Sequence, residues 1–243
     1  MHIHFIIHAD FELPGAYERW AQNKGHTIAY SRLYDGETLP ENVNDMDMLI
    51  VMGGPQSPLT SLTECPYFDS LAEQNLIIAA KDAGKVVIGV CLGAQMIGQA
   101  LGGMVEHSPE KEIGSFPIFL TEQGLNNSFV SHFGTELTVG HWHGDMPGLT
   151  AEAVVLAYSA GCPRQIITYA PLVYGFQCHL EFTHDLVETL IAHAYVNSDL
   201  INPNPYIQSK TELRAQDYAE MNGKLYAFLD KISEHYLSLN PII

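Results

Sequence analysis

The stretch KVVIGVCLGAQ, residues 85–95, decides the fold class. Its VVIGV segment is short and apolar, as expected of a strand that is covered on both faces. A helical pattern begins directly after it, and glycines at positions 89 and 93 frame Cys91 at the junction. Because strands that lead straight into helices are typical of parallel sheets, this stretch predicts an α/β protein.

The same alternation of apolar runs and helical patterns fills the first half of the chain. The predicted strands are residues 2–9, 26–33, 46–52 and 85–90, and the predicted helices are residues 14–25, 63–85 and 94–103. After Gly103, shorter apolar runs with tight turns predict some antiparallel strands, followed by a helix from about residue 183 to 195. We therefore expect a mixed, mostly parallel sheet with helices on both faces.

A polar stretch with two prolines, residues 197–207, interrupts this pattern. Ser209 and Glu212 then have the spacing of a capping box, and a striped apolar pattern predicts one helix from about residue 208 to 238. We therefore divide the chain into a domain at 1–196 and a linker with a helical extension at 197–243. The extension is expected to pack on its own domain or on a second subunit, and to be dispensable for the chemistry at Cys91.

Composition limits the partners and the location. The 243 residues include 11 Lys+Arg and 28 Asp+Glu, a formal net charge of −17. Such a surface repels phosphate backbones and anionic lipids, which argues against nucleic-acid and membrane partners. The chain has no signal-peptide pattern, no run of 18 apolar residues and no paired spacing among its four cysteines. Reduced thiols and a cytoplasmic location are expected.

Cys91 is the first candidate catalytic residue. The helix that follows it presents free N–H groups, which favour a thiolate and lower its pKa. The backbone N–H of Leu92 would point to where an oxyanion forms. A cysteine chosen at random is more often a small buried apolar residue, but the glycines on both sides favour a nucleophile held on a tight turn.

The sequence QCHLE, residues 177–181, is the second candidate feature. It ends an apolar run, and strand alternation predicts that His179 and Glu181 face the same side. Glu181 could then accept from one imidazole nitrogen and direct the other toward a thiol. An isolated His–x–Glu is more often structural; the nucleophile motif elsewhere in the chain favours catalysis.

Two further stretches surround these candidates. MGGPQ, residues 52–56, follows a predicted strand, and its glycines would let a backbone amide approach a ligand. HWHGD, residues 141–145, could supply His141, His143 and Asp145 to a metal ion, but their spacing matches no closed metal site. We expect no metal and, without a phosphate-binding glycine signature, no nucleotide cofactor. His2, His4 and His8 are interpreted as ordinary histidines of a strand.

In this order and spacing, GVCLGAQ, MGGP and HLE resemble the class I, triad-type glutamine amidotransferase family. KEIG, residues 111–114, and HWHGD are similar to its stand-alone members related to the glutaminase domain of GMP synthetase. The resemblance covers residue 1 to about residue 195. It implies a flavodoxin-like sheet and a catalytic triad of Cys91, His179 and Glu181 that forms a γ-glutamyl thioester.

The resemblance also implies a set of residues around the triad. It assigns oxyanion donors to the backbone of Gly54 and Leu92, and substrate contacts to Gln95, Trp142, His143 and Asp145. Many relatives have glycine where this chain has Gln56. We therefore expect Gln56 to change how the α-amino and α-carboxylate groups of the substrate are held.

The function expected from these features is hydrolysis of the side-chain amide of glutamine or a γ-glutamyl compound, with release of ammonia or an amine. The ammonia would pass to a synthase subunit in trans, or the enzyme would act alone as a γ-glutamyl hydrolase. A non-catalytic binding or regulatory module and a thiol stress protein on the same fold are the alternatives. A non-catalytic module would be expected to lack a triad residue. A thiol stress protein does not need the His–x–Glu pair.

Overall fold

The computed structural model describes residues 1–194 and 204–240, so the predicted linker at 197–207 lies mostly outside the described residues. The strands form one sheet in the order β2-β1-β3-β4-β9-β8-β7-β5-β6. The parallel part contains β2 (Thr27–Arg32), β1 (His2–Ile7), β3 (Met48–Val51), β4 (Val86–Val90) and β9 (Val173–Phe176). β4 therefore lies in the interior of the sheet, next to β9.

The other strands are antiparallel to their neighbours. They are β8 (Ile166–Ala170), β7 (Val154–Ser159), β5 (Glu106–Leu120) and β6 (Glu136–Met146). β5 and β6 form a long ribbon whose pairing is interrupted by a register shift between His107 and Glu112. The predicted flavodoxin-like, mixed α/β fold is confirmed.

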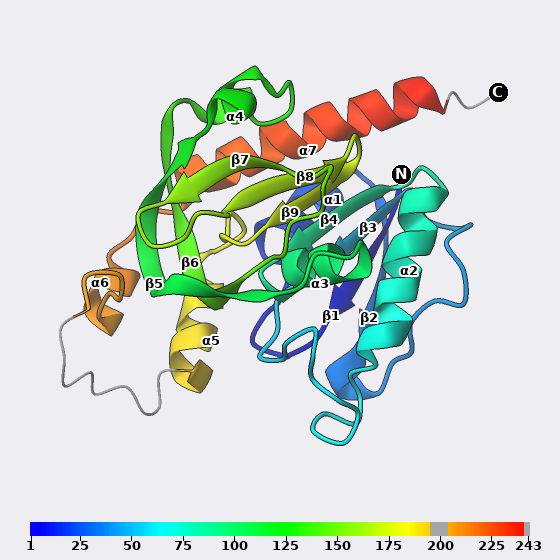
Figure 1. Ribbon diagram of the computed structural model, residues 1–243, viewed down its shortest axis with the longest axis horizontal. Helices are drawn as coiled ribbons and strands as arrows, with labels where there is room; N and C mark the ends of the chain where they lie inside the picture. Colours follow the sequence, from blue (N-terminus) through cyan, green and yellow to red (C-terminus); the bar gives the residue numbers. More distant parts are fainter. Residues whose placement is uncertain (195–203, 241–243) are drawn as a thin grey trace.

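Helices cover both faces of the sheet (Figure 1). α1 (Ala16–Asn23), α5 (His184–Ala194) and α7 (Ala219–Leu239) pack on one face, and α2 (Ser70–Asp82) and α3 (Leu92–Ala100) pack on the other. Consecutive residues of β3 alternate between the two cores: Ile50 joins the cluster that contains Trp20 and Phe228, and Leu49 joins the one with Ile97. This alternation explains why the parallel strands are apolar throughout.

The C-terminal extension differs from its prediction as one helix. It consists of α6 (Lys210–Arg214) and α7, with a break at residues 215–218. The predicted capping box of Ser209 and Glu212 starts only the short α6. The chain then turns: just before α7, the Asp217 carboxylate accepts from the N–H of Ala219 at 2.9 Å, as in an Asx turn.

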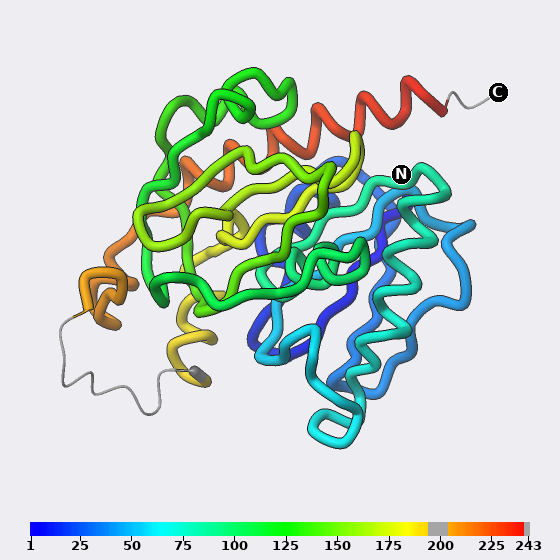
Figure 2. Tube along the Cα trace, viewed as in Figure 1, coloured from blue at the N-terminus to red at the C-terminus, as the bar shows by residue number. Residues whose placement is uncertain are grey.

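α7 returns across the sheet to lie beside α1, as the trace in Figure 2 shows. The indole of Trp20 donates to Asp230 at 2.8 Å, and Lys24 forms an ion pair with the same carboxylate. The remaining short helices are α4 (Glu122–Asn126), η1 (Leu33–Asp35) and η2 (Ser131–Phe133). Helices α1 and α7, which are far apart in the sequence, are thus packed on the same face of one sheet.

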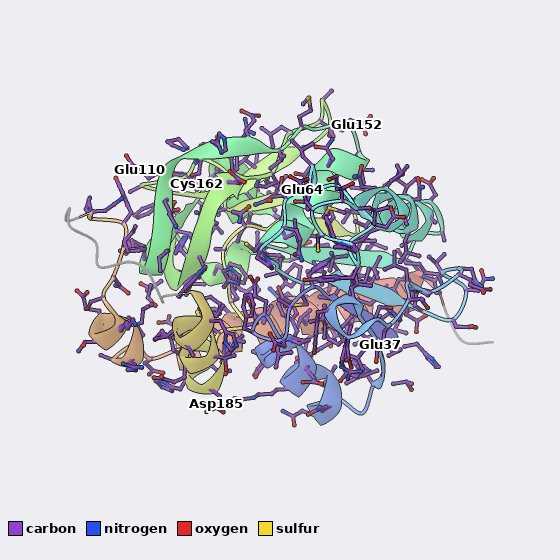
Figure 3. All side chains as sticks on the ribbon, turned by 90° about the horizontal axis from the view of Figure 1, so that it is seen from below. Glu37, Glu64, Glu110, Glu152, Cys162 and Asp185 are labelled. Atoms are coloured by element: carbon purple, nitrogen blue, oxygen red, sulfur yellow. The ribbon has the colours of Figure 1, made fainter. Side chains whose placement is uncertain are left out.

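The acidic charge is spread over the molecule. In Figure 3, Glu37, Glu152 and Asp185 are labelled at well-separated places around the ribbon. Among the described residues, no helix combines the length and the apolar character needed to cross a membrane.

Candidate active site

Cys91 lies on a tight turn between β4 and α3. Its φ is 52°, and it is the one non-glycine residue with positive φ in the described part of the chain. The neighbouring glycines are required by packing: a Cβ on Gly89 would lie 2.3 Å from the Gly93 carbonyl oxygen, and one on Gly93 would lie 2.0 Å from that of Val51. The turn therefore holds the thiol at the carboxyl edge of the sheet.

His179 and Glu181 lie beyond the end of β9, which stops at Phe176. Strand alternation was therefore the wrong reason for their common orientation. His179 instead exchanges backbone hydrogen bonds with Gly140 of β6, at 2.8 and 2.9 Å. Its Nδ1 lies 2.6 Å from Glu181 Oε1, and both side chains are buried.

The electrostatics of this pair favour a protonated imidazole. Burial by itself lowers the pKa of His179, but the Glu181 carboxylate and the nearby Cys91 outweigh burial and raise it well above its usual range. His179 Nε2 is buried and meets no nitrogen or oxygen partner among the described residues, whereas the Cys91 thiol interacts with the His179 side chain. The Cys91 sulfur lies 3.8 Å from the carbonyl oxygen of Trp142.

The predicted residues line two adjoining spaces. A pocket of about 390 Å³ is lined, among others, by Gly54, Gln56, Cys91, Leu92, Gln95, Trp142, His143 and Asp145. A smaller space beside it is lined by His179 and Glu181, together with Glu12 and Trp142, which also line the pocket. We call the first space the Cys91 pocket; its size suits a small-molecule ligand.

Gly54 and Leu92, whose backbone N–H groups were predicted as oxyanion donors, both line this pocket. His8 Nδ1 donates to the carbonyl oxygen of Gly53 at 3.0 Å. Because C=O and N–H point in opposite directions across a trans peptide, the N–H of Gly54 points away from His8. Leu92 is the first residue of α3, where N–H groups have no partner within the helix. That these two amides bind a negatively charged oxygen stays a prediction.

The other pocket residues are held by neighbours. Gln95 donates to Gln177 at 3.0 Å, and Gln56 donates to Tyr67 at 3.1 Å. The Asp145 carboxylate lies 2.6 Å from Nδ1 of His107. These contacts fix the polar groups in position before a ligand binds.

His141 and His143 face the carboxylate of Glu112, and His143 Nδ1 also lies 3.1 Å from the backbone carbonyl oxygen of Asp145. The three side chains lie close enough together to hold a metal ion. The Glu112 carboxylate, however, already accepts from Ser159 at 2.8 Å and from Gln165 at 2.7 Å. Burial lowers the pKa of His141 to about 3, so this imidazole is neutral. The arrangement is a buried hydrogen-bond network next to the pocket.

Sequence reasoning missed His8, Glu12 and Glu73. His4 has the structural role expected of a strand histidine, since it contacts Ser31 at 2.9 Å. His8 lies beyond β1, where its Nε2 is 3.0 Å from the carboxylate of Glu73 on α2. A single histidine or glutamate carries no spacing signal, and the partner of His8 lies 65 residues away.

Comparisons with known proteins agree with this architecture. The model of the glutamine amidotransferase class-I family matches residues 21–196. The chain is 56% identical over 233 residues to the glutamine amidotransferase-like protein YfeJ of Salmonella typhimurium, covering 96% of this chain and 98% of that one. It is 28% identical over 194 residues to the glutamine-hydrolyzing GMP synthase of Tolumonas auensis, covering 76% of this chain and 35% of the synthase.

A solved structure is similar along its whole length. The crystal structure of SMU.1228c superposes with a TM-score of 0.92 at 50% identity, covering 96% of this chain and 100% of that one. The family model covers more than half of the chain, and the solved structure shares its fold. The resemblance read from the motifs is confirmed, and the chain belongs to the class-I glutamine amidotransferase family.

Proposed function

We propose that this protein is a cysteine-dependent amidohydrolase that cleaves the side-chain amide of glutamine or a γ-glutamyl compound. The supporting observation is the strained turn at Cys91, which faces a pocket whose adjoining space contains the His179–Glu181 pair. A positive φ at a non-glycine residue costs about 1–3 kcal/mol, and such strain is concentrated where it positions a reactive group.

In the proposed reaction, the Cys91 thiolate attacks the amide carbon, and the N–H groups of Gly54 and Leu92 stabilise the oxyanion. His179 donates its proton to the leaving nitrogen, the C–N bond breaks, and ammonia or an amine departs. Water then attacks the γ-glutamyl thioester and gives a proton to His179. The C–S bond breaks, the γ-carboxylic acid departs, and the thiolate of Cys91 is restored. Glu181 holds His179 Nδ1, so that Nε2 is free for both transfers.

The amino-acid end of the substrate would lie at the wall made by Gln56, Gln95, Trp142, His143 and Asp145. Asp145 offers a carboxylate to an α-ammonium group, and the two glutamine amides offer donors and acceptors. The Gln56 side chain donates to Tyr67 and lines the Cys91 pocket. It therefore fills part of the pocket that would stay open if residue 56 were glycine.

Two versions of the reaction fit this site. In one, ammonia passes to a synthase subunit in trans; the similarity to a glutamine-hydrolyzing GMP synthase, of which this chain covers 35%, supports that version. In the other, the enzyme hydrolyses γ-glutamyl amides or peptides alone, as the size of the Cys91 pocket allows. We assign the enzyme to the cytoplasm, since its four cysteines are unpaired.

A release assay tests the proposal. Ammonia and amine release would be measured with glutamine, γ-glutamyl amides and γ-glutamyl peptides, with and without cell extract. We expect Cys91→Ala and His179→Ala to abolish release, whereas Cys65→Ala, which changes another buried thiol, keeps it. A glutamine-like diazo-ketone should label Cys91 ahead of the other cysteines. Equal labelling of all four cysteines, with no release from any substrate, would favour a non-catalytic module.

A further inference from the structure

Glu12 lies where the two spaces of the site meet. It belongs to the connection between β1 and α1, and it lines both the Cys91 pocket and the small space that holds His179 and Glu181. The triad proposed above contains one carboxylate, Glu181. The structure thus brings a second carboxylate to the boundary between the nucleophile and its imidazole.

The backbone makes room for this carboxylate. A Cβ on Gly53 would lie 1.9 Å from Glu12 Oε2 and 3.5 Å from the Cβ of Cys91. The Glu12 carboxylate therefore occupies the space that a side chain at Gly53 would need, on the side of that residue that faces Cys91. This approach is possible because residue 53 is glycine.

The charge of Glu12 is set by its surroundings. Burial raises the pKa of Glu12 to about 7, against the opposing effects of His179 and His8 and with a reinforcing effect of Glu181. Glu12 is half-buried at the wall of the Cys91 pocket, and its raised pKa means that the carboxyl group changes charge near neutral pH, above the usual range of a glutamate.

The groups that face Glu12 and His179 come from several elements. Around the pair lie His8 after β1, Glu73 on α2, Cys91 at the start of α3, His141 on β6, and Glu181 after β9. The Cys91 pocket adds Lys111, His143, Asp145 and His193. Among these, His179 and His8 are the groups whose positive charge acts on Glu12.

We propose that Glu12 is a positioning residue of the catalytic site, whose carboxylate stabilises the imidazolium of His179 and thereby the thiolate of Cys91. This inference rests on the proposed function of Cys91 and His179. The two residues share one proton in the resting enzyme, on sulfur or on nitrogen. A negative charge beside the ring favours nitrogen, because it stabilises the imidazolium. Ionised Glu12 therefore increases the fraction of reactive thiolate.

The sign of the pH effect follows from this coupling. Below about pH 7 Glu12 is protonated and neutral, so it gives His179 no support. Above that pH Glu12 is ionised, and the fraction of Cys91 that is present as thiolate rises. Removal of the Glu12 carboxylate should therefore lower the reactivity of Cys91 in alkaline solution and leave it unchanged in mildly acidic solution.

The test measures alkylation of Cys91 by iodoacetamide, mapped by mass spectrometry, from about pH 5.5 to pH 9. We expect the nearly isosteric Glu12→Gln variant to react about tenfold more slowly than wild type at pH 8, the effect of a shift of roughly one pKa unit at His179. At pH 5.5 the two rates should agree. Glu12→Asp keeps a carboxylate and should retain most of the increase in alkylation rate at alkaline pH. Asp10→Asn removes an exposed charge from the same connection and should follow wild type throughout.

Two results would overturn the inference. One is an equal loss of rate at every pH, which indicates a structural role for Glu12. The other is an unchanged pH profile in Glu12→Gln. A failure of the proposed function gives a different result, because alkylation needs no substrate: Cys91 would then react no faster than Cys65, and His179→Ala would not slow it. The midpoint of urea unfolding of each variant shows whether the fold is intact.

Discussion

At the scale of single residues, Cys91 shows how the backbone holds strain. Its N–H donates to the Phe176 carbonyl of β9 at 2.7 Å, and its own carbonyl accepts from the first turn of α3. Gly15 adopts nearly the same conformation before α1, with φ also 52°. Glycine is required at position 15, where a Cβ would lie 2.4 Å from the carbonyl oxygen of Glu181, whereas the turn at Cys91 has room for a side chain and carries the backbone strain.

The His8–Glu73 pair gives a prediction at the same scale. Both imidazole nitrogens face acceptors, Gly53 O and the Glu73 carboxylate, and the side chains are fully buried. Burial lowers the pKa of His8, but Glu73 and Gly53 reverse the shift and raise it. Breaking such a pair costs about 3–5 kcal/mol. We expect that loss in unfolding free energy for His8→Gln at pH 6.

The pH dependence of that loss has a definite sign. A histidine with a raised pKa contributes stability that is full below its unfolded pKa of about 6.5 and is lost as pH rises through the folded value. The difference between wild type and His8→Gln should therefore be smaller at pH 9 than at pH 6. Urea unfolding with Glu73→Gln and the double variant measures the coupling; a difference that grows with pH would contradict a charged pair.

At the scale of elements, glycines give contrasting predictions. Gly93 of α3 packs so closely on β3 that a Cβ would lie 2.0 Å from the backbone of Val51. Gly223 of α7 has no atom within 4 Å of such a Cβ. We expect Gly93→Ala to lose soluble, folded protein, because two backbone segments must separate. Gly223→Ala should gain about 0.5–1 kcal/mol from helix propensity. Thermal unfolding of both variants checks this, and equal effects would contradict the packing argument.

The elements also show what the sequence could predict. The strand at 85–90 and its turn at Cys91 were predictable, because apolar runs and glycine frames are local signals. The break between α6 and α7 was not, since the apolar stripe runs on through it and the turn at Asp217, whose carboxylate accepts from the N–H of Ala219, has no distinct sequence signal. Glu12 and His8 were missed because their roles depend on partners that only the fold brings near.

At the scale of the whole molecule, the C-terminal helix α7 is hydrogen-bonded to the segment that carries Glu181. The Asn222 side chain of α7 donates to the carbonyl oxygens of Leu180 and Phe182, at 2.7 and 3.1 Å. These carbonyls lie on either side of Glu181. The buried face of α7 includes Leu225, Phe228, Leu229 and Ile232. The expectation that this extension is dispensable for Cys91 chemistry therefore no longer follows, because its removal would uncover the core beneath the catalytic segment.

Asn222→Ala tests this support without removing the helix. Two carbonyls of a largely buried segment would lose their donor, which costs about 1–3 kcal/mol. We expect lower unfolding free energy and slower alkylation of Cys91, because the segment that carries His179 and Glu181 loses its anchor on α7. Asn240→Ala, at the other end of the same helix, removes a bond to Tyr236 within the helix and should keep the wild-type alkylation rate. If Asn222→Ala is destabilised but labels Cys91 at the wild-type rate, α7 supports the fold alone, and the geometry of the catalytic segment is set by its pairing with Gly140 of β6.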